Sequence, residues 1–125
     1  MEPRHKGREL AFKALYSWEL NKSTIFADIT NIDNESSPFG EDLFTGVIGN
    51  IEYIDQILSK NLVNWHINRI NKIDLSILRL SIYSLIFLKD IPKVITINEA
   101  INISKDYGTD QSYKFVNGIL DSINI

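Results

Sequence analysis

The chain has 125 residues, of which 44% are hydrophobic and 23% charged, the size and composition of one globular domain. It contains no cysteine, which excludes disulfides, thiolate nucleophiles and cysteine-ligated zinc. The net charge of −3 argues against a generally basic nucleic-acid-binding protein. Any contact with nucleic acid must therefore depend on a local basic cluster.

Neither the N-terminus nor the apolar segments resemble a targeting or membrane sequence. Residues 1–6 are charged and are not followed by an apolar signal core. The longest apolar stretch, Ile82–Leu88, is interrupted by Ser84 and is too short to span a bilayer. We therefore expect a cytoplasmic protein with no membrane anchor.

An amphipathic helix is predicted near the N-terminus. Between Glu9 and Leu20, apolar residues recur at steps of three and four, at Leu10, Ala11, Ala14, Leu15 and Trp18. Pro3 is tolerated near such a helix start, because the N–H group that it lacks would have no helical partner there. The segment 31–40 combines Asn, Asp, Ser, Pro and Gly, which predicts a loop between an N-terminal helical part and the rest.

Two or three further helices are predicted in the middle of the chain. A helical stripe begins at Leu43 and continues to Leu62, and Gly46 and Gly49 leave open whether it forms one bent helix or two short ones. The segment Ile73–Leu88 is apolar on more than one face, so we expect it to be the central, most buried helix. The sequence Asp-Ile-Pro at 90–92 ends it.

The remaining sequence predicts two more helices. Thr96 and Glu99 have the spacing of a capping box, which would open a helix through Lys105. Gly108 is placed to end that helix in a left-handed conformation, and Asp110 to cap a last helix over 111–122. Residues 93–97 are the only short β-like run, and a helix boundary explains them equally well. The predicted fold class is all-α.

The sequence offers no catalytic or metal-binding pattern. His5 and His66 lack the spacing of metal ligands. No glycine-rich phosphate loop or nucleophile elbow is present, and adjacent carboxylates such as Glu41 and Asp42 are typical of a helix N-terminus. We predict a protein that is not an enzyme and that uses neither a metal nor a cofactor.

A cluster of positive charge near the N-terminus is the first candidate functional feature. It consists of Arg4, His5, Lys6 and Arg8, extended by Lys13. On or before a first helix, these side chains could contact phosphates through charge-assisted hydrogen bonds. A solvated, partly disordered tail is the alternative, and the cluster by itself favours that alternative.

Aromatic residues beside this cluster are the second feature. Phe12 and Tyr16 lie four residues apart, one turn after Arg8, so the three side chains share a helix face. Single-stranded RNA is bound by such combinations of basic and aromatic side chains. Packing in the core is the preferred interpretation for Phe12 and remains equally open for Tyr16. Trp18 and Trp65 are assigned to packing.

A third feature is Tyr113-Lys114-Phe115, which again alternates aromatic and basic residues and is a weak hint of RNA binding by itself.

Four segments of the chain resemble the NusB family in order and spacing. These segments are 14–20 (ALYSWEL), 73–80 (IDLSILRL), 97–100 (INEA) and 114–121 (KFVNGILD). The resemblance covers the chain from Arg4 to Asp121. It implies one domain over 1–125, of about seven helices arranged as two small packed bundles.

The resemblance also implies a function in transcription antitermination. Members of the family bind single-stranded boxA RNA together with the ribosomal protein NusE, and they join RNA polymerase on ribosomal RNA operons. The matching positions place Arg4, Lys6, Arg8, Tyr16, Lys114 and Phe115 on the RNA side, to which the clusters above add Lys13 and Tyr113. Asp74 matches the acidic position that faces NusE. The N-terminus has fewer arginines than is usual in the family, and Gly7 is expected to loosen the helix start, so we expect weak RNA binding without the partner.

Two alternatives remain open. The chain could be the RNA-binding part of an RNA cytosine methyltransferase. It could also be a protein-interaction or self-association module, and both a monomer and a homodimer remain open.

Two structural hypotheses follow from the sequence. Arg79 and Glu99 are expected to pair across a helix interface. Tyr16 and Phe115 are expected to meet on one surface, which requires the first and last helices to pack side by side.

Overall fold

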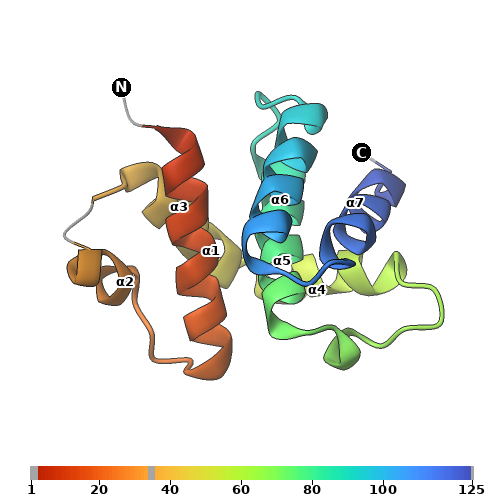
Figure 1. The fold of residues 1–125 in the computed structure, drawn as a ribbon, viewed down its shortest axis with the longest axis horizontal. Coiled ribbons are helices and arrows are strands. Elements are labelled where there is room, and N and C mark those ends of the chain that lie inside the picture. The colour runs from red at the N-terminus through yellow and green to blue at the C-terminus, as the bar shows by residue number, and fades with distance from the viewer. Residues whose placement is uncertain (1–2, 34–35, 125) are drawn as a thin grey trace.

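In the computed structural model, which describes residues 3–33 and 36–124, all regular secondary structure is helical (Figure 1). The elements are α1 (Arg4–Leu20), α2 (Phe26–Asp33), α3 (Pro38–Gly49), α4 (Ile51–Lys60), a 3₁₀ turn η1 (Ile67–Arg69), α5 (Lys72–Phe87), α6 (Lys93–Tyr107) and α7 (Ser112–Ser122). The all-α prediction is confirmed. The stripe from Leu43 forms two helices, and α2 was not predicted.

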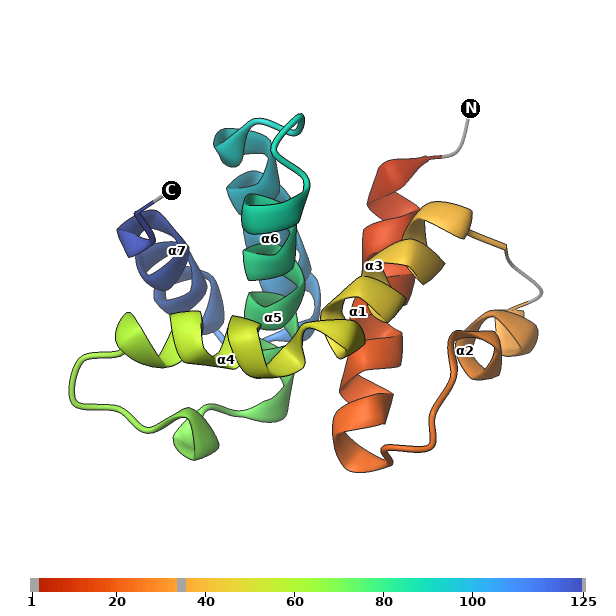
Figure 2. The same ribbon diagram turned by 180° about the vertical axis from the view of Figure 1, so that it is seen from behind.

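The helices form two packed groups that share one central helix. α1 packs against α2 and α3, while α4, α6 and α7 all pack against α5 (Figures 1 and 2). α5 also contacts α1 and α3, so it joins the two groups. This arrangement confirms the expectation of two small bundles.

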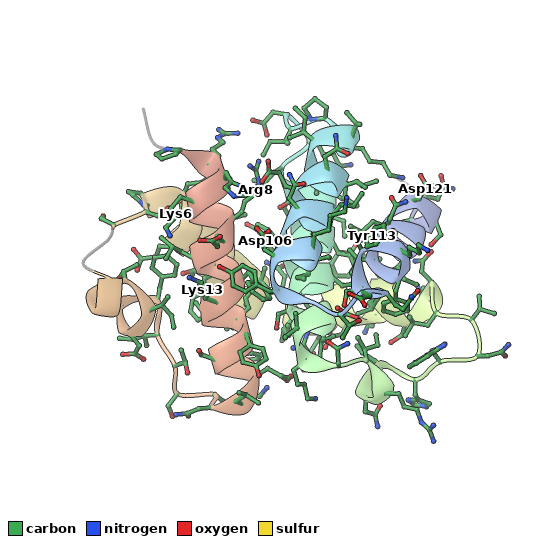
Figure 3. All side chains as sticks on the ribbon, in the orientation of Figure 1. Lys6, Arg8, Lys13, Asp106, Tyr113 and Asp121 are labelled. Atoms are coloured by element: carbon green, nitrogen blue, oxygen red, sulfur yellow. The ribbon has the colours of Figure 1, made fainter. Side chains whose placement is uncertain are left out.

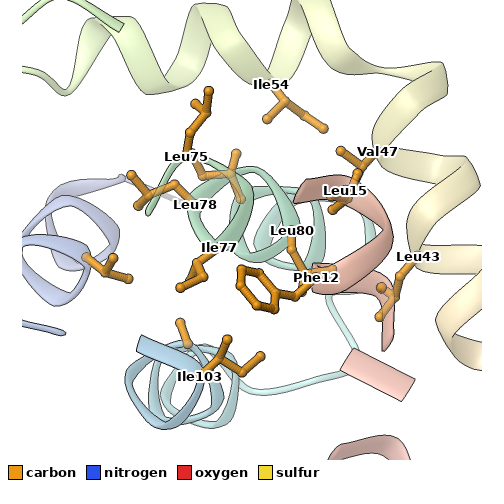
Figure 4. Close-up of a cluster of buried hydrophobic side chains, with 14 of the residues drawn as sticks. Phe12, Leu15, Leu43, Val47, Ile54, Leu75, Ile77, Leu78, Leu80 and Ile103 are labelled. Carbon is orange, nitrogen blue, oxygen red and sulfur yellow. The ribbon is translucent and has the colours of Figure 1, made fainter. Parts of the chain in front are cut away.

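The position of α5 explains its unusual composition. Every residue from Asp74 to Ile82 is buried, as expected for a helix that is apolar on more than one face. Figure 4 shows the buried side chains that surround it, among them Phe12, Leu15, Leu43, Val47, Ile54 and Ile103. Burying each such large apolar side chain contributes about 1.5–3 kcal/mol.

Some helix-end predictions are wrong, because other residues satisfy the ends of the helices. α6 begins at Lys93, directly after Pro92, so Thr96 is a buried residue inside the helix rather than its cap. Gly108 has φ −90° and ψ −170°, an extended conformation rather than a left-handed one. A β-carbon there would lie 2.7 Å from the carbonyl oxygen of Ser104, so the position needs a glycine for space. α7 begins after Gln111, and Asp110 does not cap it.

Gly7 also has a role different from the expected one. It is buried where α1 crosses α3, and a β-carbon there would lie 2.7 Å from the Ser37 hydroxyl and 3.2 Å from the Gly40 nitrogen. The Ser37 hydroxyl accepts a hydrogen bond from that nitrogen at 2.9 Å and so caps α3. Gly7 therefore lets the two helices approach closely instead of loosening the start of α1.

A buried ion cluster joins the two groups of helices. The Arg79 guanidinium on α5 donates two hydrogen bonds to the Asp55 carboxylate on α4 and one to Glu19 on α1, each at 2.9 Å. Burial alone would lower the pKa of Arg79, but these hydrogen bonds outweigh burial and raise it. The expected pair of Arg79 with Glu99 is wrong, because Glu99 lies at the other end of α1, beside His5.

Replacing Arg79 by alanine is predicted to lower the free energy of unfolding by about 3–5 kcal/mol, because it removes a buried guanidinium and leaves two partly buried carboxylates without their partner. Lys22→Ala is the matched control. Lys22 contacts the same Glu19 carboxylate at 3.0 Å, but its side chain is 58% exposed, so its loss should cost less than about 1 kcal/mol. Denaturant unfolding of both variants would measure the difference, and equal losses would contradict a dominant role for the buried cluster.

The same cluster predicts a pH dependence. Burial alone would raise the pKa of Glu19, but hydrogen bonds from Arg79 and Lys22 outweigh it and lower the pKa. A carboxylate with a lowered folded-state pKa stabilises the fold fully above its unfolded pKa, and this contribution is lost as the pH falls through the folded value. In that acidic range the wild type should lose more unfolding free energy than Arg79→Ala, in which Glu19 has lost its main partner.

Candidate nucleic-acid interface

The RNA-binding residues predicted from the sequence lie in three places rather than on one patch. Arg4, Lys6 and Arg8 lie at the start of α1, Lys13 and Tyr16 further along it, and Tyr113, Lys114 and Phe115 on α7. α1 and α7 do not pack against each other, because α5 and α6 lie between them (Figure 1). The prediction that the first and last helices lie side by side is therefore wrong, and Tyr16 lines a different cleft from Phe115.

At the start of α1 the basic residues are ordered by an aromatic ring and a carboxylate. The guanidinium carbons of Arg4 and Arg8 lie 4.9 and 5.4 Å from the centre of the Phe39 ring, within the range of cation–π contact. Glu99 on α6 faces this cluster, with its Oε2 atom 2.7 Å from His5 Nδ1. Residues 4–8 are thus part of a helix, which contradicts the alternative of a disordered tail for the part described.

A second carboxylate balances the lysines of α1. Glu9 Oε1 lies 3.1 Å from Lys6 Nζ and 3.9 Å from Lys13 Nζ. Burial alone would raise the pKa of Glu9, but hydrogen bonds from Lys6 and Tyr107 outweigh it and lower the pKa. Glu9 therefore stays ionised at neutral pH and offsets much of the positive charge along this face of α1.

The middle of α1 borders an apolar cleft of about 390 Å³. Its walls come from both groups of helices, and its lining residues are Phe12, Lys13, Tyr16, Ser17, Ile29, Ile73 and Tyr107. Phe12 is 3% exposed and its ring centre lies 5.1 Å from that of Tyr107, which confirms that it packs in the core. Tyr16 is partly exposed at the wall of the cleft.

Lysines and tyrosines alternate from α1 across α6 to α7. Lys13 Nζ lies 5.7 Å from the centre of the Tyr107 ring, and Lys105 Nζ and Lys114 Nζ lie 5.0 and 5.9 Å from that of Tyr113. We call these five residues the cation–aromatic band; Figure 3 labels Lys13 and Tyr113 at its two sides. Lys105 and Tyr107 were not predicted from the sequence, because Lys13 is distant in sequence from Tyr107 and Tyr113 lies on a different helix from Lys105.

Asp106 interrupts this band. It is exposed on α6 between Lys105 and Tyr107 in the sequence, and Figure 3 shows it between the side chains of α1 and those of α7. A carboxylate at this position repels phosphate. The band is therefore chemically suited to RNA through its rings and lysines, but its net charge is small.

A separate groove of about 370 Å³ lies beyond Phe115 and contains Asp74. Trp65 forms one wall, and its ring packs against that of Phe115 with the centres 6.0 Å apart. It is nevertheless 54% exposed, so this packing is at the surface and not in the core. Asp74 Oδ2 accepts a hydrogen bond from Asn71 at 2.9 Å, whereas the buried Oδ1 has no partner among the described residues. Such an unsatisfied acceptor is rare and suits a hydrogen-bond donor from outside the chain. Trp18, in contrast, packs against the core as predicted.

Within the described ranges, no helix is long and apolar enough to cross a membrane. The same residues include no group of three or more His, Asp or Glu side chains that could hold a metal ion.

The fold is that of transcription antitermination factors of known structure. NusB of T. maritima superposes with a TM-score of 0.87 at 38% identity, over 98% of this chain and 90% of that one. A crystal structure of the antitermination factors NusB and NusE in complex with double-stranded RNA superposes with a TM-score of 0.86 at 29% identity, over 96% of this chain and 94% of that one.

The sequence comparisons identify the family directly. The model of the NusB family matches residues 5–124. The transcription antitermination protein NusB of Treponema denticola is 48% identical, and that of Listeria innocua 44%; each alignment covers 96% of this chain and 94% of the relative. The chain belongs to the NusB family.

Proposed function

We propose that this protein is a transcription antitermination factor that binds boxA RNA together with NusE and supports transcription of ribosomal RNA operons by RNA polymerase. The cation–aromatic band is the observation that carries the RNA part of this proposal, because its rings can stack on unpaired bases while its lysines contact phosphates. The relative of known structure that contains both NusE and RNA supports the same pair of partners.

The charges of the band predict that the chain alone binds RNA weakly. Lys13 shares the carboxylate of Glu9, and Asp106 lies within the band. A chain of net charge −3 also repels a polyanion at long range. The few phosphate contacts that remain would give a modest affinity, so a second protein must supply further contacts. Arg4, Lys6 and Arg8 would extend the RNA path along α1 in one direction from Lys13, and Tyr16 would extend it in the other.

Asp74 is the proposed contact for NusE. Asp74 lines the groove that Trp65 and Phe115 also line, and a donor of the partner that entered this groove could complete the hydrogen bonding of the buried, unpaired Oδ1. Because Phe115 follows Lys114 on α7, the RNA path and the NusE groove would adjoin there. A bound partner would thus be positioned to extend the RNA surface.

The proposed function applies to the whole chain. Residues 1–125 would act as one non-catalytic domain in the cytoplasm, without a cofactor. The relatives from Treponema denticola and Listeria innocua are named as antitermination proteins and are covered over 94% of their length, which favours this function over the RNA-binding part of a methyltransferase. Self-association through the band would compete with RNA, and a stable dimer of the RNA-free chain would reveal it.

Replacing Lys105 by alanine is predicted to weaken RNA binding by the complex with NusE and to reduce the magnitude of the slope of log K against log salt by about 0.7 on single-stranded RNA. The control is Lys60→Ala, which removes an equally exposed lysine from the end of α4. Titrations over a salt series, with boxA RNA as a single strand and as a duplex, would measure the slope. Equal effects of the two variants, or a stable dimer of the RNA-free chain through the band, would contradict the proposed surface.

Replacing Asp74 by asparagine is predicted to weaken NusE binding at least tenfold, which corresponds to about 1.4 kcal/mol, and to leave binding of bare RNA unchanged. Asparagine is suitable because Asp74 is only 5% exposed, so the larger lysine of a charge reversal would disturb the fold. Glu52→Gln is the control, since it also removes an acid from the first turn of a helix but at an exposed position. Calorimetry with purified NusE would measure both, and an unchanged affinity for Asp74→Asn would remove this residue from the interface.

A further inference from the structure

Two buried arginines of this protein have opposite environments. Arg79 is 7% exposed and donates three hydrogen bonds at 2.9 Å. Arg8 is 8% exposed, yet its guanidinium makes no hydrogen bond to the described residues, and the nearest carboxylate oxygen, Glu99 Oε2, is 4.0 Å away. A guanidinium carries five N–H donors, and at Arg8 none of them has a protein acceptor among the described residues, so the side chain keeps its capacity to donate hydrogen bonds to a ligand.

The pKa values of the two arginines reflect this contrast. Burial lowers the pKa of Arg8, the Glu99 carboxylate counteracts burial only in part, and Arg4 lowers the pKa further. For Arg79 the hydrogen bonds outweigh burial and the pKa is raised. The Arg8 site therefore holds a positive charge that its surroundings compensate incompletely, and it favours an additional anionic acceptor.

Within the described part of the chain, Glu99 is the one carboxylate within 4.0 Å of the Arg8 guanidinium, and it also contacts His5. The same Oε2 atom that lies 4.0 Å from Arg8 Nη1 lies 2.7 Å from His5 Nδ1. Glu99 thus lies closer to the more exposed His5 than to Arg8, and it places a negative charge at the position where an anion would approach Arg8. Figure 3 labels Arg8 on the side of α1 that faces α6.

We propose that Glu99 is an internal counter-ion which holds His5 and Arg8 while RNA is absent, and that an RNA phosphate replaces it on these two side chains when RNA binds. This inference rests on the proposed RNA-binding function and adds a residue that sets the RNA affinity. A phosphate can accept two parallel hydrogen bonds from a guanidinium, which the distant Glu99 carboxylate does not. Arg4 lies over the same Phe39 ring and adds positive charge to that phosphate site.

The experiment is to replace Glu99 by glutamine and to titrate the variant, in complex with NusE, with single-stranded boxA RNA over a salt series. Without the carboxylate, phosphate meets less repulsion, and Arg8 and His5 have no competing carboxylate acceptor. The affinity should rise several-fold and the salt slope should steepen by about 0.7, the value for one further phosphate contact on a single strand. Glu52→Gln removes the same charge from α4 and should leave both quantities unchanged. In the Arg8→Ala background, Glu99→Gln should give a much smaller gain.

A purely structural Glu99, which merely ties α1 to α6, gives a different result. The variant would then lose unfolding free energy while its RNA affinity and salt slope stayed at wild-type values or fell, and this outcome overturns the inference. The wild-type protein provides a second readout that does not depend on the variant's folding. The NMR signal of the Arg8 side-chain Nε–H group can be assigned because it is missing from the spectrum of Arg8→Lys. In the wild-type protein this signal should shift and become protected from exchange with solvent when RNA is added.

The two proposals can fail separately. If the wild-type complex binds boxA RNA normally while the Arg8 signal is unaffected and Glu99→Gln brings no gain, the inference about Glu99 fails and the proposed function stands. If the wild-type complex does not bind the RNA at all, the proposed function fails, and the inference fails with it.

Discussion

The guanidinium of Arg79 is a buried positive charge, and α1 and α4 must each bring a carboxylate to it. Glu19 and Asp55 meet it with three hydrogen bonds of 2.9 Å, so α1 is held at a fixed position on α5. Because α6 and α7 pack on the same central helix, this cluster also fixes where Lys13 lies relative to Lys105 and Lys114. Breaking a buried ion cluster is costly, so the arrangement of the cation–aromatic band depends on an interaction outside it.

Paired charges also explain how an acidic chain can present a surface suited to RNA. Glu9 lies beside Lys6 and Lys13, and Glu99 lies beside His5 and Arg8. These carboxylates let cations gather along α1 without strong mutual repulsion, but they also compete with phosphate. The proposed dependence on NusE follows from this competition, because a small number of available cations gives little affinity by itself.

The sequence predicts those features of the fold that depend on near neighbours. The spacing of apolar residues predicts α1 and α5 because it reports which side of a helix is buried. It does not predict the partners of Arg79, which are 60 and 24 residues away in the chain. The capping box at Thr96 failed for a related reason, since Pro92 starts the helix one turn earlier. For the candidate site, sequence identified the types of residue at both ends of the band. It missed Lys105, Tyr107 and Trp65, whose aromatic or charged neighbours are brought to them by tertiary packing.

The central claim is that RNA crosses the face formed by α1, α6 and α7 of the chain bound to NusE. Backbone amide chemical shifts of the isotope-labelled chain in that complex, recorded while boxA RNA is added, test it most directly. We predict shift changes at Lys13, Lys105 and Lys114 and along residues 4–8, with none around Tyr53 and Lys60 on α4. Changes confined to α4, with the band unaffected, would contradict the account.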